Sequence, residues 1–418
     1  MGVLIQAERM WLGPGRIEES WGIRVEGNRI EEVGPVRRLR QGRPVGETIL
    51  DCGRSVLMPG LVNAHVHLEL GWLRDRLSAR GGFASWVREL GRQRVQESEL
   101  LGEEGMRREI VQSIRLGAME MLHHGTTSFL DVSNSGLPFE ILPEQGPHAL
   151  AALECLGLDR PRAESILGRA RDYVGVAKRG RIQALAVPHA LYSCSTDLLQ
   201  GLGDPALHRG VSTFHLLESR EESDLFRLGL GPLRAFVDEI CPDNDLLAGE
   251  DPLDRLERFF GTDAALVVVH GYALESSQIQ RLARWGASLC LCPSSRQFFL
   301  NPPIPFAEIG RHKLPLCLGT DSLASAPTLS LWHEMRILRE EYPSLEPGRI
   351  LSWATEGGAK ALGLATGKLS PGLFADWIAV EAADVPTDEL EEFLVTEEPD
   401  VRVVSVEGEL LLDGRWEG

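Results

Sequence analysis

Eight short runs of mostly apolar residues lie in the middle of the chain, and each predicts a strand. They are Gly60–His65, Thr126–Val132, Ala149–Leu156, Ile182–His189, Val211–Leu217, Ala265–His270, Ala287–Cys292 and Leu314–Gly319. Most are apolar almost throughout, as strands covered on both faces must be. Between several of them the apolar residues follow helical spacing, namely in Glu103–Leu122, Leu329–Glu340 and Arg349–Leu362. Strands that alternate with helices in this way predict an α/β fold, a (β/α)8 or TIM-like barrel.

The two ends of the chain show a different pattern, in which apolar and polar residues alternate. Residues Gly22–Val33 alternate around Gly27-Asn28, and Val401–Leu412 alternate around Glu407-Gly408. Both segments predict hairpins. Because a two-stranded piece cannot bury its faces alone, we expect the two ends to join in one small β-sandwich. The predicted domains are residues 1–58 and 366–418 for the sandwich and 59–365 for the barrel.

Composition and charge limit the kinds of molecule that the protein can bind and the compartment in which it is expected. The 418 residues carry a formal net charge of -18, whereas a nucleic-acid backbone requires a basic surface, so we expect a small-molecule substrate and no nucleic acid. No apolar run reaches about 18 residues, and Glu8 and Arg9 interrupt the start of the chain, so we expect no membrane segment and a cytoplasmic protein. The seven scattered cysteines predict free thiols. Whether identical chains form a homo-oligomer stays open.

Four of the predicted strands end in imidazole or carboxylate side chains. These residues are His65 and His67 after the first strand, His215 and Glu218 at the fifth, His270 at the sixth and Asp321 after the eighth. Two histidines two residues apart in a strand project from one face. Because the carboxyl ends of barrel strands converge on one mouth, all of these side chains can meet around one metal ion.

The residue types suggest a division of roles. His65, His67, His215 and Asp321 are the predicted ligands of an ion that would lower the pKa of a bound water toward about 7. Glu218, three residues beyond His215, is the predicted general acid and base. His270 either binds the metal or contacts the attacking water, and Asp321 either only binds the metal or also accepts a proton. The sequence alone does not divide these roles.

Several longer motifs surround these residues. They are Met58–His67, His124–Thr127, Pro188–Ser193, His215–Glu218, Cys292–Ser295, Leu318–Ser325, Ala354–Gly363 and Gly372–Asp376. Together they make the chain resemble the amidohydrolase superfamily, in particular its cytosine deaminase, guanine deaminase and chlorohydrolase-like branch. The resemblance implies a barrel with a β-sandwich, a single Zn or Fe ion, and hydrolysis of C–N or, less often, C–Cl bonds.

The same resemblance bears on metal count and on substrate contacts. Two-metal members carry a modified lysine at the fourth strand, but that strand ends here in Val187-Pro188-His189, so one divalent ion is expected. In the relatives that match best, the histidine of this Pro-His pair contacts the substrate. His189, and Ser325 at the end of its motif, are therefore candidate substrate contacts.

The expected substrate depends on the loop after the first strand, which carries Glu69 and Trp86. In relatives that deaminate S-adenosylhomocysteine and methylthioadenosine, an acidic residue near this tryptophan holds the ribose hydroxyls, and here Phe83 and Ser85 occupy that neighbourhood. The segment most resembles the aminodeoxyfutalosine deaminases of the futalosine route to menaquinone. An aminated purine nucleoside, 6-aminodeoxyfutalosine, is thus the expected substrate, with Glu69 and Trp86 as contacts.

Other interpretations stay open at this point. The substrate could be guanine, cytosine, S-adenosylhomocysteine, methylthioadenosine or a chlorotriazine, and an idle binding protein could keep the same fold. Glu69 could instead cap a helix or pair with Arg74.

Overall fold

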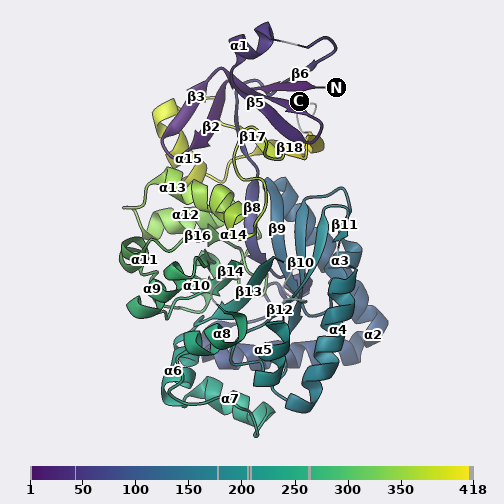
Figure 1. The fold of residues 1–418 in the computed structure, drawn as a ribbon, viewed down its shortest axis with the longest axis vertical. Helices are drawn as coiled ribbons and strands as arrows, with labels where there is room; N and C mark the ends of the chain where they lie inside the picture. The colour runs from purple at the N-terminus through teal and green to yellow at the C-terminus, as the bar shows by residue number, and fades with distance from the viewer. Residues whose placement is uncertain are drawn as a thin grey trace.

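All eight predicted strands are present in the computed structural model, which describes residues 2–42, 44–176, 178–204, 207, 210–261 and 265–413. They form two parallel sheets in the middle of the molecule (Figure 1). One sheet has the order β12-β10-β9-β8, with the short antiparallel β11 (Lys178–Arg179) at its edge, and the other has the order β13-β14-β15-β16. The bounds are β8 Leu61–Val66, β9 Thr126–Ser133, β10 His148–Cys155, β12 Ile182–Pro188, β13 Val211–Leu216, β14 Ala265–His270, β15 Ser288–Leu291 and β16 Leu316–Leu318.

The edges of the two parallel sheets meet at both sides through isolated parallel bridges. Val66 pairs with Asp321, and Ala190 pairs with His215. The main-chain N–H of Asp321 donates to the carbonyl of His65 at 3.1 Å, and that of His215 donates to the carbonyl of His189 at 2.9 Å. Both junctions thus lie at strand ends that carry predicted site residues.

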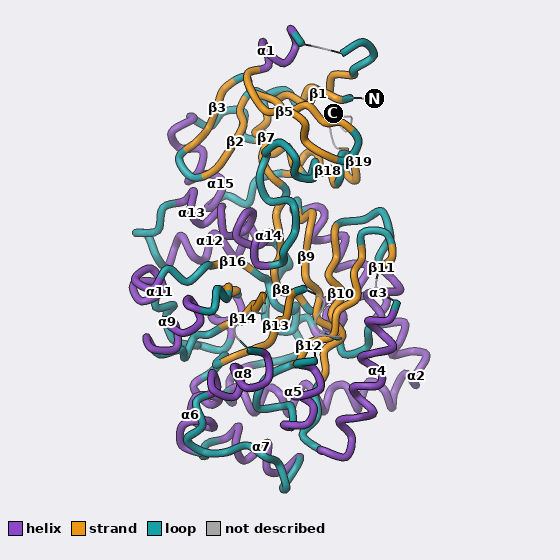
Figure 2. The backbone as a smooth tube through the Cα atoms, viewed as in Figure 1, coloured by secondary structure: helices purple, strands orange, loops and turns teal. Residues whose placement is uncertain are grey.

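Helices cover the outside of these strands (Figure 2). The longest, α2 (Phe83–His123), bends at Gly102, whose φ of 68° departs from helical geometry. The predicted helix Glu103–Leu122 is its second half. The predicted Leu329–Glu340 corresponds to α12 (Leu331–Glu341), and Arg349–Leu362 corresponds to α13 (Pro347–Ser352), a π turn and α14 (Gly358–Ala361). The other helices are α1 Val36–Gln41, α3 Leu137–Ile141, α4 Ala163–Gly175, α5 Thr196–Leu202, α6 Arg220–Leu228, α7 Pro232–Ile240, α8 Pro252–Phe260, α9 Ser276–Arg284, α10 Pro293–Phe298, α11 Phe306–His312 and α15 Leu390–Thr396.

The two chain ends come together in a pair of further sheets, at the top of Figure 1 where purple and yellow segments meet. A four-stranded sheet has the order β5-β4-β1-β6, and a six-stranded sheet has the order β19-β18-β17-β7-β2-β3. Both predicted hairpins are present, as β4–β5 and β18–β19. The bounds are β1 Val3–Gln6, β2 Arg9–Gly13, β3 Arg16–Glu19, β4 Trp21–Glu26, β5 Arg29–Pro35, β6 Thr48–Asp51, β7 Ser55–Pro59, β17 Trp377–Glu381, β18 Val401–Val406 and β19 Glu409–Asp413.

One apolar core joins these two sheets. Ile5 and Ile23 of the four-stranded sheet share it with Met10, Trp377 and Val403 of the six-stranded sheet. Within the six-stranded sheet, β7 from the first part of the chain pairs antiparallel with β17 from the last part. Burial of apolar surface from both ends therefore holds the chain ends together.

Two expectations from composition can be compared with the structure. The seven cysteines all lie in the described part of the chain and form no disulfide with one another, as predicted. None of the helices in the described part of the chain combines the length and the apolar character that a bilayer-spanning segment needs.

Candidate active site

The end of β8 carries His65 and His67 into a buried space between the strands. The Asn63 side chain holds this strand end, because its Nδ2 donates to the Thr320 hydroxyl at 2.8 Å and its Oδ1 accepts from the Thr320 N–H at 3.3 Å. The centroids of the His65 and His67 rings are 4.7 Å apart. Both ring nitrogens of His65 are buried and have no hydrogen-bond partner in the described part of the chain, an arrangement that is costly unless a ligand occupies them.

Three other strand ends bring their side chains to the same place. His67 Nε2 lies 3.2 Å from Nε2 of His215. Asp321 Oδ1 lies 3.9 Å from His65 Nε2 and 3.8 Å from His67 Nε2. The His270 ring centroid is 5.9 Å from that of His65. The structure thus brings together five side chains that the sequence placed on four separate strands.

The backbone at these strand ends adopts a conformation that side-chain-bearing residues rarely take. Leu217, His270 and Asp321 have φ values of 48°, 72° and 57°. Such left-handed conformations cost free energy in residues other than glycine, and they cluster at functional sites. Here they occur at the ends of β13 and β14 and just after β16, where the histidine cluster lies.

The donor set fits one divalent metal ion. The structure places His65 with His67 and Asp321, and His65 with His215 and His270, in groups whose ligand atoms all lie within 4.8 Å of one another. His215 Nδ1 lies 2.9 Å from the carbonyl oxygen of His189. Because a carbonyl oxygen only accepts hydrogen bonds, Nδ1 carries the proton and Nε2 is available to a metal. Imidazole and carboxylate ligands suit both zinc and iron.

Burial favours the neutral form of three imidazoles of the site, which is the form that binds metal. It lowers the pKa of His215 to about 3 and that of His270 to about 4. It also lowers the pKa of His65 well below its usual value. The cluster can therefore offer nitrogen lone pairs at neutral pH.

The pKa values of Glu218 and Asp321 are shifted in opposite directions. Burial, aided by the charges of Asp321 and Glu222, raises the pKa of Glu218 well above its usual range. Burial also acts to raise the pKa of Asp321, but nearby imidazoles, His270 foremost, outweigh it and the net shift is downward. Glu218 Oε1 lies 3.6 Å from Nε2 of His270. One carboxyl group is therefore suited to hold a proton and the other to bind a cation.

Ser325 and His189, the two candidate contacts from the motifs, both border the cluster. The Ser325 hydroxyl donates to Asp321 Oδ2 at 3.0 Å, so it orients that carboxylate. His189 Nδ1 lies 2.7 Å from the Ser193 hydroxyl, and its ring centroid is 4.9 Å from that of His215. The remaining ring nitrogen of His189 is thereby available near the mouth of the site.

Glu69 lies apart from the metal-binding groups and is fully engaged. Its two oxygens accept hydrogen bonds from the Ser133 hydroxyl at 2.7 Å, from the N–H groups of Asn134 and Ser135 at 2.9 and 3.0 Å, and from Arg94 at 3.3 Å. Four donors fill the acceptor positions of a carboxylate. Arg74, the alternative partner, instead donates to Glu120 at 2.8 Å.

Trp86 belongs to an aromatic cluster at the start of α2. Its ring centroid is 6.3 Å from that of Phe83 and 5.1 Å from that of Phe299, which follows α10. The indole N–H is buried and has no hydrogen-bond partner. The α2 end that carries this cluster is fixed by Glu221, whose carboxylate accepts from the N–H groups of Phe83 and Ala84 at 2.8 and 3.0 Å.

Two acidic residues of the site were not identified from the sequence. Glu222 on α6 is fully buried and accepts a hydrogen bond from the main chain of Glu218. Glu154, near the end of β10, is 5% exposed and lies 3.7 Å from Nδ1 of His215. An acidic residue within an otherwise apolar predicted strand was the signal that could have identified Glu154.

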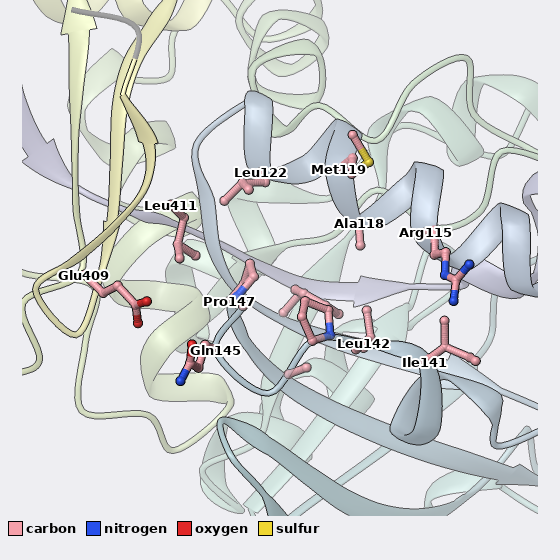
Figure 3. A pocket seen from close by; sticks show the side chains of 14 residues that line it. Arg115, Ala118, Met119, Leu122, Ile141, Leu142, Gln145, Pro147, Glu409 and Leu411 are labelled. Atoms are coloured by element: carbon pink, nitrogen blue, oxygen red, sulfur yellow. The ribbon is translucent and has the colours of Figure 1, made fainter.

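Two cavities help to locate the site. A cavity of about 580 Å³ lies between α2, the loop after α3 and β19 (Figure 3). None of the predicted site residues lines it, and it reaches the strands at Phe129 and Ala149, near their amino ends. A second cavity, of about 400 Å³, is lined by Ser325 and Ser294 and adjoins the Asp321 loop. The predicted site residues thus lie at the carboxyl ends of the strands, the place where barrel enzymes carry their active sites.

Comparison with known proteins gives a family and several relatives. The amidohydrolase family model matches residues 56–411, a range that contains every predicted site residue. A 5-methylthioadenosine/S-adenosylhomocysteine deaminase of Pyrococcus abyssi is 25% identical over 371 residues, which cover 85% of this chain and 80% of that protein.

Two solved structures share the fold over almost the whole chain. Aminofutalosine deaminase of Helicobacter pylori, in complex with methylthio-coformycin, superposes with a TM-score of 0.85 at 21% identity and covers 98% of this chain and 100% of its own. An adenosine deaminase of Xanthomonas campestris with bound zinc superposes with a TM-score of 0.79 at 22% identity, with 99% and 93% of the two chains covered.

Proposed function

Because the chain belongs to the amidohydrolase family, we propose that it is a metal-dependent deaminase that replaces the amino group of an aminated purine nucleoside with oxygen from water. The observation that carries this proposal is the position of Glu218. This buried carboxyl group lies 3.6 Å from His270 and borders a cluster of imidazoles that fits a metal ion. Water activation and proton transfer can therefore occur at one point.

The proposed metal ligands are His65, His67, His215 and Asp321, which would hold one divalent ion, zinc or iron. Such an ion would lower the pKa of a bound water toward about 7 and so supply the nucleophile. The end of β12 reads Val187-Pro188-His189 and offers no lysine to bridge a second ion. The zinc in the Xanthomonas campestris structure is consistent with this assignment.

Glu218 is the proposed proton carrier. Because its raised pKa favours the protonated form, it donates its proton to a ring nitrogen of the purine as the carbon that bears the amino group gains oxygen, and it takes a proton from the attacking water in return. Asp321 and His270 hold the water, and the second water proton leaves with the amino group as ammonia. One water is consumed and one ammonia is released for each 6-oxo product.

Within this class we propose 6-aminodeoxyfutalosine as the substrate. The motif around His67 and Trp86 supports this choice, and so does the superposition on a protein named aminofutalosine deaminase. The Pyrococcus abyssi relative is named for methylthioadenosine and S-adenosylhomocysteine, so these two nucleosides are the alternative. His189 and Ser325, which lie beside His215 and Asp321, are proposed to contact the substrate. Trp86 is a further proposed contact.

A substrate panel tests the proposal. Purified enzyme with a determined metal content is assayed for ammonia release from 6-aminodeoxyfutalosine, methylthioadenosine, S-adenosylhomocysteine, adenosine, guanine and cytosine, and for chloride release from a chlorotriazine. We expect the highest kcat/KM with 6-aminodeoxyfutalosine. A preference for guanine, cytosine or the chlorotriazine would contradict the nucleoside assignment, and no turnover with one metal bound would favour a binding protein.

We further infer the architecture that holds this site. The bridges at Val66–Asp321 and Ala190–His215 support one closed (β/α)8 barrel made from the two parallel sheets. The shared core of the chain-end sheets supports a β-sandwich. The proposed domains are 59–365 for the barrel and 1–58 with 366–418 for the sandwich, whose outer ends, residue 1 and residues 414–418, lie outside the described residues.

A further inference from the structure

Glu154 presents one unpartnered carboxylate oxygen to the proposed metal ligands. Its Oε2 accepts a hydrogen bond from Asn134 Nδ2 at 2.7 Å, whereas its Oε1 is buried and has no hydrogen-bond partner among the residues that the structure describes. Oε1 lies 3.7 Å from His215 Nδ1, and Glu154, His67 and His215 offer atoms within 4.8 Å of one another. The oxygen without a hydrogen-bond partner therefore lies beside two of the proposed metal ligands, His67 and His215.

A series of hydrogen bonds fixes the position of the Glu154 side chain. Asn134, which holds Glu154, accepts a hydrogen bond at its Oδ1 from Arg94 at 2.9 Å. Arg94 in turn donates to Glu69 at 3.3 Å. This chain of contacts links α2 with the loops after β8 and β9 and fixes the carboxylate at the end of β10. A buried carboxylate oxygen that is so firmly positioned yet unpartnered indicates a donor that arrives with a ligand.

The chemistry of Glu154 restricts that ligand. An ionised carboxylate only accepts hydrogen bonds, so the ligand must present a donor. A phosphate or carboxylate at this point would meet both Glu154 and Glu69, while Arg94 is engaged by Asn134 and Glu69. A neutral hydroxyl group meets both conditions.

We propose that Glu154 is a specificity-determining residue that accepts a hydrogen bond from a ribose hydroxyl of the substrate. This inference rests on the proposed function, since it requires a nucleoside. Glu69, a substrate contact expected from the sequence, does not compete for this role, because four donors already occupy its carboxylate. His189, whose ring lies 4.9 Å from that of His215, borders the same space.

The test compares sugar discrimination in wild-type enzyme and in Glu154→Ala and Glu154→Gln. Metal-loaded proteins are assayed with adenosine, 2′-deoxyadenosine and 3′-deoxyadenosine, and metal content and Tm are measured alongside. For the wild type, loss of the contacted hydroxyl should lower kcat/KM by about 10- to 100-fold, the scale of a hydrogen bond to a charged group. In Glu154→Ala this discrimination should fall to within about twofold, because the acceptor is gone, and Glu154→Gln should retain part of it.

A second readout and a control separate binding from structure. In a Glu218→Gln background, calorimetric titration should show the same loss of discrimination in Kd. Glu164→Ala, which removes an exposed carboxylate on α4, is the control. It should change the discrimination between the nucleosides neither in kcat/KM nor in Kd.

Each failure has its own signature. Equal losses on all three nucleosides in Glu154→Ala, with reduced metal content, would overturn the inference and assign Glu154 to the support of His215. Unchanged discrimination in that variant would also overturn it. Wild-type enzyme that releases ammonia from guanine or cytosine but from none of the nucleosides would instead refute the proposed function, and this inference with it.

Discussion

The main-chain N–H of Glu218 donates a 2.9 Å hydrogen bond to the carboxylate of Glu222, four residues further along the chain. Between them, Ser219 accepts the N–H of Glu222 at its hydroxyl, at 3.2 Å, and so caps the start of α6. Leu217, the residue directly before Glu218, has a φ of 48°. Glu222 thus stabilises the turn that aims the proposed proton carrier at the histidine cluster.

Replacement of Glu218 by Gln should abolish most turnover while the metal stays bound. Gln keeps the size of the side chain but cannot carry the proton, so kcat should fall roughly 10²-fold or more. Steady-state kinetics with elemental analysis measure both effects. Glu103→Gln, an exposed change on α2, is the control, and near-normal turnover in Glu218→Gln would show that Asp321 or His270 carries the proton.

Replacement of Glu222 by Ala should lower kcat more than it changes KM. The variant loses the acceptor for the Glu218 N–H, and a small misplacement of a catalytic group costs about 10- to 100-fold. Glu222→Gln, which keeps an acceptor oxygen, should retain more activity. Asp224→Ala on the same helix, where the side chain is 44% exposed, is the matched control, and equal kinetics in Glu222→Ala and wild type would exclude a positioning role.

Each chain should bind one divalent ion. The imidazole and carboxylate donors form one compact cluster at the strand ends, and a ligand that binds only the folded state stabilises it. Removal of the ion by a chelator should lower Tm and abolish activity, and addition of Zn or Fe should restore both. His65→Ala should lose metal, whereas His123→Ala, exposed at the end of α2, should not; two tightly held ions per chain would contradict this prediction.

The free energy of unfolding should fall as pH rises from 4.5 to about 8, because Glu334 titrates differently in the folded and unfolded chain. Burial raises the pKa of this carboxyl from 4.5 to about 8. Between these values the folded chain keeps a proton that the unfolded chain releases, so rising pH favours unfolding until about pH 8. Glu334→Gln should remove this contribution to the pH dependence. The difference between the Tm of the variant and the Tm of the wild type should therefore increase in favour of the variant between pH 5 and 8.

A control on the same helix tests this assignment. Glu340 is exposed on α12, so Glu340→Gln should leave the slope of Tm against pH as in the wild type. If Glu334→Gln shows the wild-type slope as well, Glu334 is not the group that titrates.

The strands and most of the residues that meet at the candidate site could be predicted because their signals are local. A strand buried on both faces is an apolar run, and the His65–His67 spacing alone places two imidazoles on one face. Convergence of the other ligands required only the rule that the carboxyl ends of barrel strands share a mouth. The first half of α2 was missed because it buries only Phe83 and Ala84 and so lacks an apolar stripe.

The roles of the carboxylates could not be read from sequence, since their partners are distant along the chain. Glu69 is held by residues 133–135, more than 60 positions away. Glu154 faces His215, and Glu334 binds the N–H of Ser294 at 2.8 Å. Whether such a group is free for a substrate depends on how many donors already reach it, which only the folded arrangement determines.

The most direct test of the account is the fate of the amino group and of the incoming oxygen. Metal-loaded enzyme is incubated with 6-aminodeoxyfutalosine in water labelled with a heavy oxygen isotope, and ammonia is quantified while the product is analysed by mass spectrometry. The account predicts one ammonia for each 6-oxo product, with the label in that product and only slow reaction in Glu218→Gln. An unchanged nucleoside, or a product formed without ammonia release or without the label, would contradict hydrolytic deamination at this site.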